Sequence, residues 1–200
     1  MWWLHNLSSS NGLSFLSKDP DLLIYSDASL YGWGFSYDGI QSRGPWTLDD
    51  RFRHINELEL LAAFYALKSL TAHSSDLSVH MVLDNSTAVC YINNRGGTKS
   101  KSLCALAKSI VAWCEEKRLS ISATHLPGVI ISIADDQSRR SLDASDWMLN
   151  KAAFHDIQTL WPTEIDLFSA AWNAQHQKFV SWTLQPDAFA LNAFALNWSR

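Results

Sequence analysis

Cysteine is scarce in this sequence of 200 residues: Cys90, Cys104 and Cys114 are the only three, and none belongs to a Cys-x-x-Cys pair. The odd number and the spacing exclude a disulfide framework and a zinc site built from paired cysteines. Unpaired cysteines are typical of reducing compartments. We therefore expect three reduced core thiols in an intracellular protein, in the cytoplasm or the nucleus.

Long apolar runs and an excess of positive charge are also missing. No run reaches the roughly 20 residues of a membrane-spanning helix, and the opening MWWLHNL lacks the basic start of a signal peptide, so we expect no membrane partner. The net charge of −4 argues against indiscriminate coating of nucleic acid, although a local basic groove remains compatible with it. A hydrophobic content of 47% suffices for a core, in one domain with an appendage or in two small domains.

The apolar pattern predicts an α/β order. Strands are expected at 22–27, 32–38, 40–46, 77–84 and 119–128, and helices at 57–70, 86–93, 102–118 and 133–140. Asn56 is the expected N-cap of the first helix. This order favours a mixed sheet with helices packed on it.

The character of the chain changes after about Leu142. Five of the ten tryptophans lie between Trp147 and Trp198, and residues 188–197 repeat a pentapeptide, AFALNAFALN. We interpret 142–200 as a separate Trp-rich C-terminal extension, and the repeat as a local duplication that is too short for a solenoid.

Two carboxylates stand at strand ends. Asp27 ends the first strand and Asp84 ends the fourth. If these strands are parallel neighbours, both acids lie at the carboxyl edge of the sheet, where open α/β sheets bind their ligands. The alternative for Asp27 is a turn aspartate that caps local backbone amides.

The first helix offers two further acids, Glu57 and Glu59, which point in nearly opposite directions. Glu59 shares its stripe with small and apolar residues that would let the helix lie close to the sheet, namely Ala62, Ala63, Ala66 and Leu70. The alternative for Glu59 is a capping box with Asn56.

A fourth acid, Asp135 or Asp136, opens the last helix of this region after His125. Four acids at one edge would repel one another unless cations lie between them. Magnesium takes carboxylate and water oxygens together with substrate phosphate. Two such ions about 3.5–4 Å apart can activate a water and stabilise the leaving oxygen of a phosphodiester.

Four segments in this order, YSDASLYGWGF, INELELLAAFYAL, LDNSTAV and THLPG…IADDQSR, resemble the ribonuclease H domain of a retroelement reverse transcriptase. The segments HINELELLA and YINNRGGTKS are most similar to those of DIRS-type retrotransposons, which also encode a tyrosine recombinase. The resemblance covers about residues 20–140. It implies a ribonuclease H-like mixed five-stranded sheet flanked by helices.

The resemblance also implies an activity, which is hydrolysis of the RNA strand of RNA/DNA hybrids with two magnesium ions, for which manganese can substitute. The family's metal-binding residues fall on Asp27, Glu59, Asp84 and Asp135. His125 stands where cellular ribonucleases H of this type have a mobile histidine. The alternative for His125 is a loop histidine that only hydrogen-bonds the backbone, which Ile131 keeps open because the family usually has Asn there.

The resemblance also sets the expected domains. Residues 1–20 are expected to link to a reverse transcriptase polymerase domain, 21–141 to form the ribonuclease H-like domain, and 142–200 to be an incomplete extension. A competing interpretation is a catalytically silent connection or scaffold fragment that only binds nucleic acid. Loss of one of the four acids would favour it, and all four are present.

Nucleic-acid contacts are expected from the segment RGGTKSK. Its cations and exposed amides, from Arg95, Gly96, Gly97, Lys99 and Lys101, suit a phosphate backbone, and Asn85 next to Asp84 is a further candidate. The alternative is a solvated basic turn between two helices.

Overall fold

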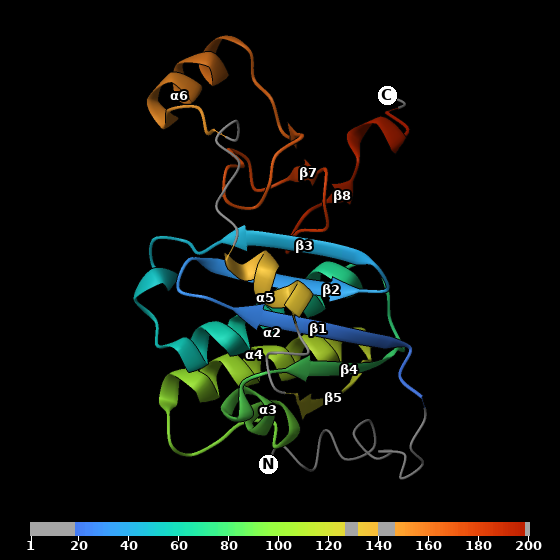
Figure 1. The fold of residues 1–200 in the computed structure, drawn as a ribbon. Helices are drawn as coiled ribbons and strands as arrows, with labels where there is room; N and C mark the ends of the chain where they lie inside the picture. The colour runs from blue at the N-terminus through green and yellow to red at the C-terminus, as the bar shows by residue number, and fades with distance from the viewer. Residues whose placement is uncertain (1–18, 127–131, 140–146, 199–200) are drawn as a thin grey trace, which may run out of the picture.

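The computed structural model describes residues 19–126, 132–139 and 147–198. Five strands form one mixed sheet in the order β3-β2-β1-β4-β5 (Figure 1). They are β1 (Leu22–Ala28), β2 (Gly32–Tyr37), β3 (Ile40–Pro45), β4 (Ser78–Leu83) and β5 (Ser120–His125). The first three strands are antiparallel, whereas β4 runs parallel to both β1 and β5. This topology confirms the predicted sheet.

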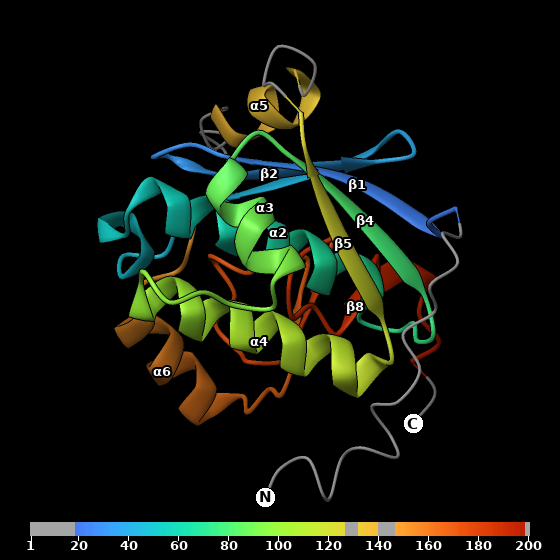
Figure 2. The same ribbon diagram turned by 90° about the horizontal axis from the view of Figure 1, so that it is seen from below.

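Helices cover both faces of the sheet. One face carries α2 (Ile55–Thr71), α3 (Ser86–Asn93) and α4 (Lys101–Lys117), and the other carries α5 (Ser132–Arg139), which lies over β1, β2 and β3 (Figure 2). The main core lies between the sheet and α2. Its fully buried side chains include Ile24, Phe35, Leu58, Leu67 and Met81. The predicted helix boundaries agree with the observed ones to within two residues, and the helix at 86–93 agrees at both ends.

Helix α2 begins earlier than predicted. Its N-cap is His54, whose backbone is extended and whose Nδ1 accepts a hydrogen bond from the Asn56 N–H at 3.1 Å. The prediction of Asn56 as the N-cap is therefore wrong, because Asn56 already lies within the helix. Glu59 is the fifth helical residue, too far from the cap for a capping box, so that alternative is excluded.

All three cysteines are free, but their surroundings differ. Cys114 is buried and Cys104 is half-buried, as expected of core thiols. Cys90 is exposed on α3, so its prediction as a core residue is wrong. The helix buries Ala88, Tyr91 and Ile92 instead. The last two residues of the strand predicted at 119–128, and Ile131, lie outside the described residues.

The extension forms a small unit of its own secondary structure. Helix α6 (Lys151–Leu160) precedes a three-stranded parallel sheet of β6 (Asp166–Leu167), β7 (Phe179–Ser181) and β8 (Ala190–Leu191). The short 3₁₀ helices are η1 (Asp50–Phe52), before α2, and η2 (Ala193–Ala195). The two copies of the AFALN repeat therefore contribute different elements, β8 and η2.

The extension packs on the edge strand β3 (Figure 1). The Ser42 hydroxyl donates to the backbone oxygen of Leu184, and the Gln185 side-chain amide donates to the Arg43 backbone oxygen at 3.0 Å. Lys68 of α2 also forms an ion pair with Asp187. These contacts cover one edge of the main sheet. Within the described ranges, no helix is long and apolar enough to cross a bilayer.

Candidate metal centre

Three acids meet at the carboxyl end of the parallel strands. Strand β1 pairs with β4 so that Ser26 stands opposite Leu83, which places the next residues, Asp27 and Asp84, side by side. One carboxylate oxygen from each of Asp27, Glu59 and Asp84 lies within 4.8 Å of the others. Asp27 and Glu59 are buried, whereas Asp84 reaches solvent.

Glu59 reaches this edge because α2 lies close on β1. Its small residues Ala62, Ala63 and Ala66 are buried against the sheet. Glu59 itself is 5% exposed, and its Oε2 has no hydrogen-bond partner within the part of the chain that the structure describes. A buried carboxylate oxygen without a partner is costly, and a bound cation is one way to satisfy it.

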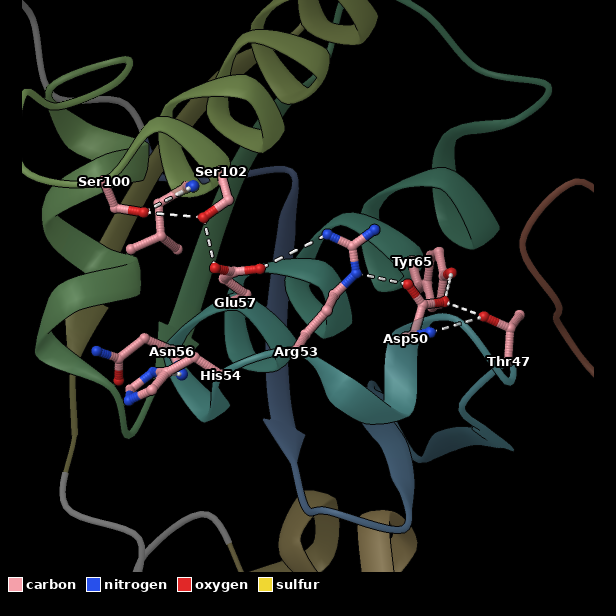
Figure 3. Close-up of polar contacts among 10 residues, drawn as sticks. Thr47, Asp50, Arg53, His54, Asn56, Glu57, Tyr65, Ser100 and Ser102 are labelled. Carbon is pink, nitrogen blue, oxygen red and sulfur yellow. Dashed lines mark hydrogen bonds and ion pairs between the residues drawn. The ribbon is translucent and has the colours of Figure 1, made fainter.

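Glu57 is not part of this group of acids. It belongs to a separate polar network with residues of the preceding loop and of α4 (Figure 3). It accepts a hydrogen bond from Ser102 of α4 at 2.5 Å and lies 3.6 Å from Arg53. Arg53 also pairs with the buried Asp50 at 2.7 Å, and Asp50 accepts a hydrogen bond from Thr47. The network ties the start of α2 to the preceding loop and to α4.

Burial and mutual repulsion make the negative charges of these acids costly. Burial first, and then the negative charges of Asp27 and Asp84, raise the pKa of Glu59 from 4.5 to about 9. Burial also raises the pKa of Asp27 from 3.8 to about 6, although a hydrogen bond from Ser138 opposes this. Carboxylates that repel one another in a buried site favour a divalent cation with oxygen ligands, so the residues present fit magnesium.

Asp135 lies near the three acids but outside their close group. It stands on α5, and its charge contributes to the raised pKa values of Asp27 and Glu59. Its Oδ1 accepts a hydrogen bond from Arg139 Nε at 2.5 Å, one helical turn away. The neighbouring Asp136 is exposed. Asp135, one of the two acids that the spacing alone left open, thus acts electrostatically on both Asp27 and Glu59.

His125 stands beside the same edge, at the end of β5. Its side chain is exposed, and its Nε2 lies 3.1 Å from the backbone oxygen of Asp84. The histidine is therefore adjacent to the acids, in contact with the backbone rather than with a carboxylate.

The candidate nucleic-acid contacts fall into two groups. The loop between α3 and α4 exposes Arg95 and Lys99, and Lys101 is exposed at the start of α4. Its glycines are structurally required: Gly96 has a φ of +136°, and a Cβ on Gly97 would lie 2.6 Å from the Tyr91 ring.

The second group consists of two side-chain amides near Asp84. Asn85 caps α3 through the Ala88 N–H and donates to the Asn56 side-chain oxygen at 3.0 Å. The Asn56 side chain was missed as a site candidate, since the sequence pattern assigned it to a helix cap.

Two further residues near the acids were also missed. Ser138 donates to Asp27 Oδ2 at 2.8 Å, and Arg139 pairs with Asp135. Both follow Asp135 at helical spacing, three and four residues later, and this spacing is the signal that could have revealed them.

Comparison with solved structures finds the same fold in a ribonuclease H. The crystal structure of LC11-RNase H1 in complex with an RNA/DNA hybrid matches with a TM-score of 0.51 and 18% identity, over 58% of this chain and 93% of that chain. This likeness, together with the topology, shows that the chain has a ribonuclease H fold.

Two weaker likenesses have lower TM-scores. The N-terminal RNase H domain of rv2228c from Mycobacterium tuberculosis matches with a TM-score of 0.45 and 15% identity, over 61% of this chain and 98% of that chain. The protease-reverse transcriptase of prototype foamy virus matches with a TM-score of 0.38 and 12% identity, over 63% of this chain and 18% of that one. No protein-family profile and no curated protein matches the sequence.

Proposed function

We propose that this protein is an endonuclease that hydrolyses the RNA strand of RNA/DNA hybrids with magnesium. The observation that carries the proposal is the group of three acids within 4.8 Å at the sheet edge of a ribonuclease H fold. Their raised pKa values supply the physical reason for a bound cation. The similar LC11-RNase H1 was crystallised with an RNA/DNA hybrid, which supports this class of substrate.

The residues take the following roles in the proposal. Asp27, Glu59 and Asp84 hold metal, and Asp135 completes the set from α5. When bound, a pair of magnesium ions lowers the pKa of an attacking water and stabilises the leaving oxygen of the phosphodiester. His125 Nε2, beside Asp84, moves a proton during turnover without ligating metal.

The substrate contacts follow from the exposed groups. The cations Arg95, Lys99 and Lys101 bind backbone phosphates, and the Gly97 amide adds to them. Gly96 shapes the loop instead, because its N–H donates to the Tyr91 backbone oxygen at 2.9 Å. The paired amides of Asn56 and Asn85 lie beside Asp84, where they can reach the hydroxyl-bearing groove of the hybrid.

The wider context is part of the same proposal. The four sequence motifs support a ribonuclease H unit of a retrotransposon reverse transcriptase, which works inside the cell beside a polymerase domain. The extension packs on β3, at the edge of the sheet farthest from β5. It therefore leaves the carboxyl ends of β1 and β4, where the acids lie, to the hybrid.

Cleavage by the purified chain tests the proposal. A hybrid with end-labelled RNA is incubated with Mg²⁺ or with EDTA, and the products are resolved on a denaturing gel. Asp27→Asn should abolish cleavage, whereas Asp136→Asn, an exposed acid on α5, should leave it largely intact. Wild-type chain that binds hybrid without cutting it would favour the silent scaffold, and full cleavage in excess EDTA would exclude metal catalysis.

A further inference from the structure

Asp27 is contacted by a buried hydroxyl from α5, on the face of the sheet opposite α2. Ser138 of α5 is 1% exposed, and its Oγ lies 2.8 Å from Asp27 Oδ2. The same Oγ lies 2.9 Å from the backbone oxygen of Asp135, one turn earlier in the helix. A hydroxyl has a single hydrogen to donate, so it serves one of these two acceptors at a time.

The contact depends on an unusually close approach of α5 to β2. Gly34 is the cross-strand partner of Asp27. A Cβ on Gly34 would lie 2.7 Å from the Ser138 nitrogen and 2.8 Å from the Ala134 oxygen, so only glycine fits there. The Ser29 hydroxyl donates to the Ser138 backbone oxygen at 2.6 Å and fixes the helix from the hairpin side.

We propose that Ser138 is a positioning residue for the metal centre, which holds the Asp27 carboxylate in the orientation that it needs to share a cation with Glu59 and Asp84. The inference rests on the proposed function in one respect, that the cation at this site is a catalytic metal. With Oδ2 held by Ser138, Oδ1 is left for the cation. Partners of this kind that orient a metal ligand typically change metal affinity by about 10–100-fold.

The second acceptor makes the arrangement adaptable. If a cation takes both oxygens of Asp27, the Ser138 hydrogen can turn to the Asp135 backbone oxygen. The buried hydroxyl then keeps a hydrogen bond in either state, so metal binding leaves no unsatisfied group behind.

The test compares Mn²⁺ binding by the intact chain and its variants with calorimetry, after circular dichroism has verified the fold. Ser138→Ala should weaken Mn²⁺ affinity by about 10–100-fold. Ser138→Cys, which fills the same space with a weaker donor, should fall between Ser138→Ala and wild type. The matched control is Ser69→Ala, because Ser69 is also buried and donates within its helix, to the Tyr65 oxygen at 2.7 Å.

A second measurement tests the hydrogen bond itself. Carbon-13 NMR of the metal-free chain should show a higher pKa for Asp27 in Ser138→Ala, because the lost hydrogen bond lowers it in the wild type. The comparison with Ser138→Cys, which keeps the side-chain volume, and with Ser69→Ala separates positioning from packing. Mn²⁺ affinity within twofold of wild type in both Ser138 variants, or an equal loss in Ser69→Ala, would overturn the inference. These readouts need no cleavage, so they stand apart from a failure of the proposed nuclease activity.

Discussion

The stability of the metal-free chain should fall as the pH rises, and Glu59 should be a main cause. Its pKa is about 9 in the folded chain and 4.5 as an ordinary carboxyl. Between these values the folded chain keeps the proton that the unfolded chain has released. The folded state therefore binds more protons, and the free energy of unfolding decreases with pH in this window.

The size of the effect follows from the shift. Each pH unit inside the window costs about 1.4 kcal/mol, so Glu59 removes about 3 kcal/mol between pH 4.5 and pH 7. For a chain of 200 residues, that corresponds to a lowering of the melting temperature by roughly 6–12 °C. Glu59→Gln has no such proton to lose and should remain more stable than wild type at neutral pH in EDTA.

Urea unfolding at pH 5, 6, 7 and 8 in EDTA measures this slope. The slope for Glu59→Gln should be flatter than that for wild type by about 1.4 kcal/mol per pH unit. The matched control is Glu57→Gln, two residues away and outside the acid group, which should keep the wild-type slope. Saturating Mg²⁺ should also flatten the wild-type slope. Parallel slopes for wild type and Glu59→Gln would refute the reasoning from burial and charge.

Three further predictions concern catalysis and substrate. His125→Ala should slow cleavage by about 10²–10⁴-fold yet leave metal-dependent activity, whereas Asp135→Asn should leave almost no activity. Single-turnover cleavage rates from pH 6 to 9 measure both effects. Equal and complete loss would make His125 a ligand. Replacing Arg95, Lys99 and Lys101 by Ala should reduce the slope of log affinity against log salt by up to about 2–3, measured by fluorescence anisotropy on a hybrid. An unchanged slope would place the phosphate contacts elsewhere. The chain should cut RNA paired with DNA but spare RNA/RNA and DNA/DNA duplexes in the same gel assay, and cleavage of all three would contradict hybrid selectivity.

The acids could be predicted because their positions follow from short-range rules. Asp27 and Asp84 each stand where a strand ends, and a parallel pairing then brings them together. Glu59 follows from a stripe of small residues, which only makes sense if the helix lies close to the sheet. The stripe predicts that Glu59 rather than Glu57 lies with the other acids. The structure agrees, because Glu57 binds Arg53 and Ser102 instead.

The features that sequence reasoning missed depend on contacts between distant segments. Ser138 touches Asp27 across 111 positions of the chain, and this contact exists only because Gly34 lets α5 approach. The N-cap failed for a different reason. Asn56 is an ordinary cap residue, but His54 precedes it and offers a ring nitrogen at the position where the backbone is still extended. Local preference cannot decide between two capping candidates two positions apart when the loop geometry is unknown.

The distribution of charge explains why metal binding and proton release should be coupled. Among the residues that the structure describes, Arg139 is the one cation with a main influence on the pKa of Asp27, and it is exposed and already paired with Asp135. Within the same residues, no cation is among the main influences on the pKa of Glu59, and near neutral pH Glu59 holds a proton. A divalent cation that uses the Glu59 carboxylate must displace this proton, so its affinity rises with pH until the window closes near pH 9. Glu59 thus avoids an uncompensated buried charge by staying neutral, and it becomes a ligand only when a cation displaces its proton.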